Sequence, residues 1–242
     1  MGEVSFYGLD LDAHDPGGVA RFWTGVLGWS AHAQADGSVV VASDDDPVYR
    51  LLVRKSEAPK LGQNRIHFDL TSSTPQAMQE TIARALALGG RRIDIGQTAQ
   101  DAHEVLADPE GNELCVIEPG NNFLADTGVV GAINCDGTQA VGYFWSEALG
   151  WPLVWDENEE TAIQARTGGS KITWSGPPLM QRQGRDRLRF VLSVAAVDKV
   201  HAAVSRLEEL GATLTDASRA GTGRFEASMT DPDGNDFRIV AG

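Results

Sequence analysis

The chain has 242 residues, of which 42% are hydrophobic, so it is long enough for one large domain or for two domains of about 120 residues. Acidic residues outnumber basic residues by 34 to 20, and the net charge of −14 argues against binding to nucleic acid or to an anionic membrane surface. With two cysteines, no long apolar stretch and no secretory signal at its start, the sequence predicts a soluble cytoplasmic protein, either a monomer or a homodimer.

Four units of strand and helix patterns follow one another along the chain. The first predicts strands at Val4–Leu11, Ser38–Ala42 and Val48–Arg54, with a helix that ends at Leu27. The second predicts a helix capped by Thr74 and strands at Arg65–Leu70, Glu104–Ala107 and Glu113–Ile117. The third predicts a helix that ends at Leu149 and strands at Val129–Asn134, Thr161–Ala165 and Lys171–Trp174. The fourth predicts a helix capped by Asp198 and strands at Leu188–Val194, Arg224–Thr230 and Asp236–Val240.

The ends of the four predicted helices reveal a repeat. Each helix ends in Leu-Gly, with the glycines at positions 28, 89, 150 and 211, so that 61 residues separate each from the next. A glycine just past a helix takes the left-handed conformation that ends it. The equal spacing therefore predicts four βαβββ units.

Two further motifs group the units in pairs. The aromatic pairs Phe22-Trp23 and Phe144-Trp145 mark the odd units, and the turns Asp108–Asn112 and Asp231–Asn235 mark the even ones. We interpret the aromatic pairs as core packing and the Asp-Pro turns as hairpin connections. The sequence thus predicts two tandem domains, residues 1–120 and 121–242, that meet in the polar segment Pro119–Gly128.

The pattern Phe-Trp-x3-Leu-Gly-Trp, followed by Ile66–Leu70 and Leu106–Glu113, resembles the glyoxalase-like domain. That domain belongs to the vicinal oxygen chelate superfamily, with glyoxalases, extradiol dioxygenases and bleomycin and fosfomycin resistance proteins. The resemblance implies an α+β fold in which four βαβββ modules form two tandem domains with cupped mixed sheets. Each pair of modules would form a cup for a small molecule. Whether the two domains complete one cup together is left open.

In metal-using relatives, the resemblance implies ligands on the first and last strands of each module, four places per cup. The places fall near Gly8, Tyr49–Leu52, His67 and Cys115 in the first domain, and near Val130, Ile172, Arg189 and Arg238 in the second. Arginine side chains would repel a cation. We therefore expect no cofactor, and if a divalent metal is present, its expected ligands are His67 and Cys115.

Most candidate site residues follow from these places, while strand alternation adds His103 and a possible aromatic wall of the second cup adds Trp174. His67 and His103 are the candidate catalytic residues, although His67 is equally consistent with a structural histidine. The candidate ligand-binding residues are Tyr49, His67, His103, Cys115, Trp174, Arg189 and Arg238. Two interpretations stay open for the arginines, because they either pair with Glu226 inside a filled cup or bind an anionic ligand.

Three functional hypotheses remain. The first is a protein that binds a small organic molecule without a standard metal triad, of the antibiotic or metabolite binding and resistance type. The alternative is an enzyme of the same superfamily, a lyase, an isomerase or an enzyme of the dioxygenase type, that uses His67 as a metal ligand or general base. The third is an interaction module whose cups are filled. The sequence does not decide whether the protein is an enzyme.

Overall fold

The computed structural model describes residues 4–43, 49–98, 102–219 and 225–241. Module 1 consists of β1 (Ser5–Ala13), α1 (Pro16–Leu27), β2 (Ser30–Ala33), β3 (Val39–Ala42) and β4 (Arg50–Lys55). Module 2 consists of β5 (Ile66–Leu70), α2 (Pro75–Ala87), β6 (Arg91–Arg92), β7 (Glu104–Ala107) and β8 (Glu113–Val116). Module 3 consists of β9 (Val130–Cys135), α3 (Gln139–Leu149), β10 (Leu153–Glu157), β11 (Glu160–Gln164) and β12 (Lys171–Trp174). Module 4 consists of β13 (Leu188–Val194), the short helix η1 (Val197–Lys199), α4 (Val200–Glu209), β14 (Thr213–Arg219), β15 (Phe225–Thr230) and β16 (Asp236–Ala241).

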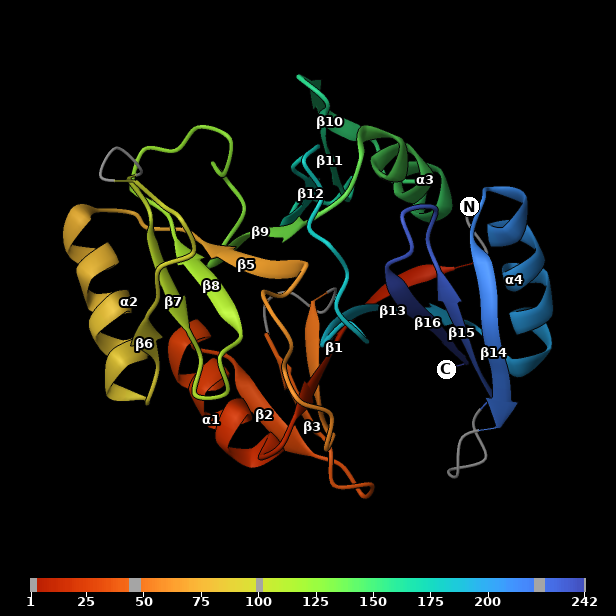
Figure 1. Ribbon diagram of the computed structural model, residues 1–242, viewed down its shortest axis with the longest axis horizontal. Coiled ribbons are helices and arrows are strands. Elements are labelled where there is room, and N and C mark those ends of the chain that lie inside the picture. The colour runs from red at the N-terminus through yellow and green to blue at the C-terminus, as the bar shows by residue number, and fades with distance from the viewer. Residues whose placement is uncertain (1–3, 44–48, 99–101, 220–224, 242) are drawn as a thin grey trace.

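The modules combine into two mixed sheets of eight strands each, which confirms the predicted α+β fold of four βαβββ modules. Modules 1 and 4 form one sheet, in the order β14-β15-β16-β13-β1-β4-β3-β2, which we call the outer-module sheet. Modules 2 and 3 form the other, in the order β10-β11-β12-β9-β5-β8-β7-β6, which we call the inner-module sheet. The helices lie toward the outside of the molecule, α1 and α2 at one end and α3 and α4 at the other (Figure 1). No helix within the described ranges is long and apolar enough to cross a membrane.

This pairing corrects the assignment of ligand places to cups. The cups expected from the sequence combine module 1 with module 2 and module 3 with module 4. In the structure, β1 pairs antiparallel with β13, and β5 pairs antiparallel with β9, so each sheet takes one module from each half of the chain. Four equal repeats are compatible with either arrangement. The repeat predicts the strands and helix within each module, but it does not predict which other module pairs with the first strand.

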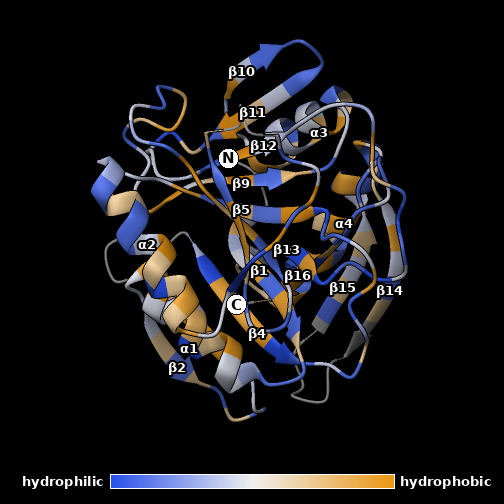
Figure 2. Cartoon of the chain, turned by 60° about the vertical axis from the view of Figure 1, so that its left-hand side comes forward, coloured by the Kyte–Doolittle hydropathy of each residue, from blue (hydrophilic) through white to orange (hydrophobic). Residues whose placement is uncertain are grey.

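Strand alternation separates a helix-covered face of each sheet from a face turned away from the helices, which we call the helix-free face. Along β5, Ile66, Phe68 and Leu70 are buried, whereas His67 and Asp69 are partly exposed. The Phe68 ring lies 5.1 Å from the Trp23 ring of α1, so the odd-numbered residues of β5 belong to the helix-free face. Figure 2 shows hydrophilic and hydrophobic residues alternating along several strands in the same way.

The predicted helix ends are mostly confirmed. Thr74 caps α2 by accepting a hydrogen bond from the Ala77 N–H, and Gly28 ends α1 in the left-handed conformation. The Asp198 cap is wrong, because Asp198 lies inside η1, and Lys199 precedes α4 without a side-chain cap. Strands β2, β6, β10 and β14 had no assigned range, since short or polar edge strands carry little hydrophobic alternation. The predicted strand starts Val48 and Arg224 lie outside the described residues.

The paired aromatic and Asp-Pro motifs are structural, as the sequence predicted. The buried Trp23 indole N–H donates to Asp108 Oδ2 over 3.2 Å, and the Trp145 indole N–H donates to Asp231 Oδ2 over 3.1 Å. Each aspartate also accepts hydrogen bonds from the asparagine that closes its turn. Burial raises the pKa of Asp231 to about 6, while hydrogen bonds from Asn235 and Trp145 act in the opposite direction. The motifs therefore join module 1 to module 2 and module 3 to module 4 on the helix-covered side of the sheets.

Substituting Trp145→Phe tests this joint. The variant keeps an aromatic ring but leaves the buried Asp231 carboxylate without one donor, so we expect the free energy of unfolding to fall by about 1–3 kcal/mol. Urea denaturation measures the loss. The control is Tyr143→Phe on the same helix, whose hydroxyl donates to Asp156 at an exposed position and which we expect to change stability by less than about 0.5 kcal/mol. Equal losses for the two variants would contradict a structural role for the Trp145–Asp231 bond.

Candidate functional site

Three side chains of the inner-module sheet gather on its helix-free face. His67 and Asp69 are two positions apart on β5 and therefore point to the same face. Cys115 of β8 lies beside Asp69. The His67 Nε2 atom lies 3.3 Å from Asp69 Oδ1. One ligand atom from each of the three residues lies within 4.8 Å of those of the other two. A histidine thus lies between a carboxylate and a thiol at the centre of the sheet, an arrangement suited to proton transfer or to hydrogen bonding with a bound molecule.

The neighbours of His67 favour its protonated form. Burial opposes the charge, but the hydrogen bonds with Asp69 and Cys115 and the negative charge of Asp69 prevail and raise the pKa of His67 to about 10. About a quarter of its side chain is exposed, so the imidazolium can still be reached from the helix-free face. At neutral pH, His67 therefore carries a proton held between two partners.

The raised pKa predicts how stability depends on pH. The folded state binds a proton at His67 up to about pH 10, whereas the unfolded chain loses it near 6.5. The stabilisation is therefore fully present below about pH 6.5 and is lost as the pH rises toward 10. Urea midpoints of the wild type and of His67→Gln should converge between about pH 6 and about pH 9. A difference between the two proteins that does not change with pH would show that His67 is not protonated in this way.

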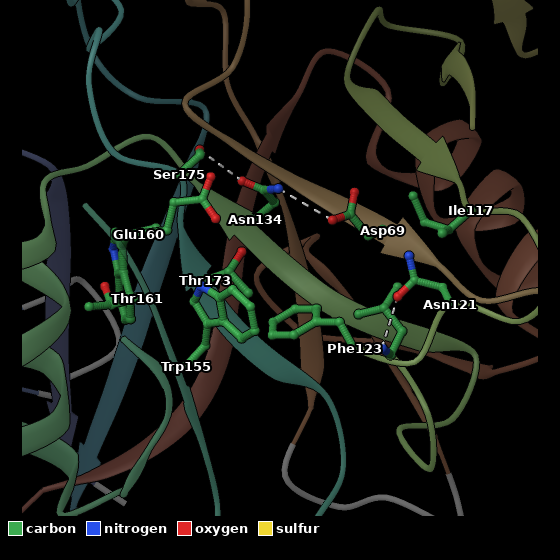
Figure 3. A pocket seen from close by; sticks show the side chains of 12 residues that line it. Asp69, Ile117, Asn121, Phe123, Asn134, Trp155, Glu160, Thr161, Thr173 and Ser175 are labelled. Atoms are coloured by element: carbon green, nitrogen blue, oxygen red, sulfur yellow. Dashed lines mark hydrogen bonds between the residues drawn. The ribbon is translucent and has the colours of Figure 1, made fainter. Parts of the chain in front are cut away.

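A polar row extends from this cluster across the sheet. In the register of the strands, Asn134 of β9 lies opposite His67, and Thr173 of β12 lies opposite Asn134. The Asn134 amide donates to Asp69 Oδ2 over 3.3 Å, and the Ser175 hydroxyl donates to Asn134 Oδ1 over 3.3 Å (Figure 3). Asp69 thereby connects His67 to the residues that line a pocket.

The pocket has a volume of about 290 Å³. It is lined by Asp69, Ile117, Asn121, Phe123, Leu124, Asn134, Trp155, Glu160, Thr161, Thr173, Trp174 and Ser175. The segment expected to be a linker between the domains supplies one wall through Asn121, Phe123 and Leu124. The Phe123 and Trp155 rings meet edge to face, 5.9 Å apart, and Trp155 is 38% exposed. An exposed tryptophan beside a hollow is typical of a binding surface.

Charged pairs occupy the equivalent positions on the outer-module sheet. The Arg189 guanidinium donates to both oxygens of Asp12, over 2.9 and 2.7 Å. Arg238 donates to both oxygens of Asp10 and, over 3.1 Å, to Glu226. The Arg238–Glu226 pair is the ion pair that the sequence suggested, but Asp10 and Asp12 of module 1 form most of the bonds. Asp10, Asp12 and Arg189 are each at most 5% exposed, so these charges are buried and paired.

The other predicted site residues lie apart from the His67 cluster. His103 lies in the bend before β7 and is partly exposed. Tyr49 is buried, and its hydroxyl donates to the Ser170 carbonyl, which joins module 1 to module 3. Trp174 is buried and is one of the residues that line the pocket.

The four-place ligand set implied for a metal is incomplete on both sheets, although His67, Asp69 and Cys115 form a group that could hold a metal ion. On the inner-module sheet, the helix-free face of β9 and β12 presents Ala132, Asn134, Lys171 and Thr173, and none of these is an imidazole, carboxylate or thiol. On the outer-module sheet, Arg189 and Arg238 stand at two of the places. Module 2 alone supplies the His67, Asp69 and Cys115 donors, whose side chains bond to one another and to Asn134.

Two groups of residues in and beside the pocket were not among the predicted site residues. Asp69 follows His67 by two positions on a predicted strand, and strand alternation alone would have placed both on one face. Asn134, Phe123 and Glu160 come from the other half of the chain, and the pairing of β5 with β9 that brings module 3 to His67 carries no sequence signal.

Comparison with known proteins agrees with this architecture. The family model described as "Glyoxalase-like domain" matches residues 9–117 and again residues 131–240. The chain belongs to the glyoxalase-like domain family. As a tandem glyoxalase-like protein, it is a member of the vicinal oxygen chelate superfamily. A search of curated proteins finds no match.

Solved structures share the fold of this tandem glyoxalase-like protein at low identity. Glyoxalase I from Zea mays is 14% identical, with a TM-score of 0.71 over 98% of this chain and 92% of that chain. A putative dioxygenase from Bacillus subtilis is 12% identical, with a TM-score of 0.63 over 98% of this chain and 84% of that chain. These likenesses extend over nearly the whole chain and support the fold.

Proposed function

We propose that the cup of the inner-module sheet binds a small organic molecule and does so without the four-place metal site of metal-using relatives. The observation that carries the proposal is the pocket of about 290 Å³, in which the Phe123 and Trp155 rings face polar groups of Asp69 and Asn134. Pockets of this kind, apolar with a few placed polar groups, are typical of small-molecule sites. The family membership also supports a small-molecule site in a cupped sheet, because members of this superfamily hold small molecules in such sheets.

The chemistry of the two sheets favours the inner-module cup over the outer-module cup. At the outer-module sheet, the guanidinium donors of Arg189 and Arg238 are already bonded to carboxylates, which argues against their use as an anion clamp. At the inner-module sheet, His67 offers a polar edge that is about a quarter exposed, next to the pocket. Of the predicted ligand-binding residues, we retain His67, Cys115 and Trp174 for this site.

A thermal-shift screen of small organic compounds tests the proposal, with Trp155→Ala as the decisive variant. Compounds that raise the melting temperature of the wild type should raise it less in the variant, because one aromatic wall is missing. Leu153→Ala is the matched control, since Leu153 lies on the same strand, is 38% exposed like Trp155 and does not line the pocket. Shifts that survive in Trp155→Ala would place the binding elsewhere and refute the proposal.

A second candidate function is an enzyme that uses His67 as a general acid, because its imidazolium has a proton to donate at neutral pH. The observation that favours it is the 3.3 Å contact between His67 and Asp69 beside a thiol and a pocket. A His67→Gln variant should then lose turnover of any compound that the wild type converts by a larger factor than it loses affinity for that compound. Metal content of both proteins, measured by plasma mass spectrometry, accompanies this test, and one equivalent of metal that is lost in the variant would overturn our metal-free interpretation.

A further inference from the structure

The charged residues that line the pocket all carry negative charge. Asp69 and Glu160 are its two charged lining residues, and both are acidic. Asp69 is engaged by His67 and by the Asn134 amide. Glu160 is exposed and forms no ion pair with any residue in the described ranges. Its carboxylate is therefore available to a charged group that enters from solvent.

The aromatic and the acidic side chains of the pocket lie on different sides of it. In Figure 3, the Phe123 and Trp155 rings lie on one side, and the carboxylates of Asp69 and Glu160 lie on the other. The faces of aromatic rings attract cations, because their π electrons carry partial negative charge. Phe123 already shows this behaviour, since the Lys171 ammonium lies 4.3 Å from its ring centre and donates to the Phe123 carbonyl.

The hairpin that bears Glu160 strengthens the negative potential at the pocket entrance. Strands β10 and β11 meet in a turn that carries Asp156, Glu157, Glu159 and Glu160, all of them exposed. Of the basic groups nearby, His67 is paired with Asp69, whereas Lys171 donates to the neutral Phe123 carbonyl and keeps its positive charge. A net charge of −14 acts in the same direction as the hairpin over longer distances.

We propose that the ligand of the inner-module cup is a small organic cation with a planar aromatic body. The body would pack against Phe123 and Trp155, and the positive charge would lie toward Glu160. This inference rests on the proposed function, because it names the ligand class of that same pocket. It needs no covalent step and no cofactor.

Isothermal titration calorimetry with two probes of the same three-ring size and opposite charge tests the inference. The probes are N-methylacridinium and anthracene-9-carboxylate. We expect the cation to bind at least about tenfold more tightly than the anion. Glu160→Gln should weaken cation binding by about two- to fivefold, as expected for one exposed charge, and should not weaken anion binding.

Glu157→Gln is the matched control, because Glu157 lies opposite Glu160 in the hairpin, has the same charge and does not line the pocket. We expect this control to weaken cation binding by less than Glu160→Gln does, because the Glu157 carboxylate does not line the pocket. Equal or tighter binding of the anion, lost in Trp155→Ala, would overturn the cation inference while leaving the pocket as a binding site. Binding of the cation that Trp155→Ala leaves unchanged would overturn both.

Discussion

Replacing Arg189 with methionine is expected to lower the free energy of unfolding by about 3–5 kcal/mol. Methionine fills similar space but leaves the Asp12 carboxylate, 4% exposed, without the guanidinium that bonds both of its oxygens. Asp10, which lies 3.8 Å from the same guanidinium, loses part of its compensation as well. Chemical denaturation measures the change.

The control for this prediction is another arginine near the same carboxylate. Arg185 lies 3.6 Å from Asp12, but its side chain is 63% exposed, so Arg185→Met should cost less than about 1 kcal/mol. The double variant Arg189→Met with Asp12→Asn removes both charges and should recover part of the loss. A small effect of Arg189→Met, similar to that of Arg185→Met, would show that the outer-module sheet does not depend on its buried ion pairs.

Replacing Gly8 with alanine is expected to cost about 3 kcal/mol or more. Gly8 has a φ of +150°, and a Cβ atom there would lie 2.3 Å from the Arg50 carbonyl oxygen. The clash is with the backbone of β4, which cannot move aside without breaking its pairing with β1. The same geometry explains why the metal-ligand place near Gly8 holds no side chain.

Gly37→Ala separates this clash from the cost of positive φ alone. Gly37 has a φ of +82°, and a Cβ atom there would meet nothing within 4 Å. We expect a loss of about 1 kcal/mol for Gly37→Ala, from backbone conformation only. Circular dichroism during thermal unfolding compares the two variants, and equal losses would refute the close approach of β1 and β4.

Most of the fold follows from the sequence because its signals are local. The Leu-Gly helix ends, the Trp23 and Trp145 positions and the Asp-Pro turns each act within one module or between successive modules. The pairing of modules 1 with 4 and 2 with 3 is a long-range choice between similar strand edges. Residue patterns within a repeat carry no information about that choice.

For the same reason, the sequence predicted the part of the site that lies within one module but not the part contributed by another module. His67 and Cys115 come from one module, and their proximity follows from neighbouring strands. Asn134, Trp155 and Glu160 reach the pocket only through the β5–β9 pairing. The acidic partners of Arg189 and Arg238 lie in module 1, more than half the chain away, so the sequence suggested Glu226 alone.

The central claim is that the inner-module cup, and not the outer-module cup, is the binding site. The most direct measurement is a fragment screen followed by ¹H–¹⁵N correlation spectra of the labelled protein. Our account predicts that fragments shift the Trp155 indole signal and the side-chain amide signals of Asn121 and Asn134, which line the pocket. Shifts that cluster instead at the guanidinium signals of Arg189 and Arg238 would contradict it.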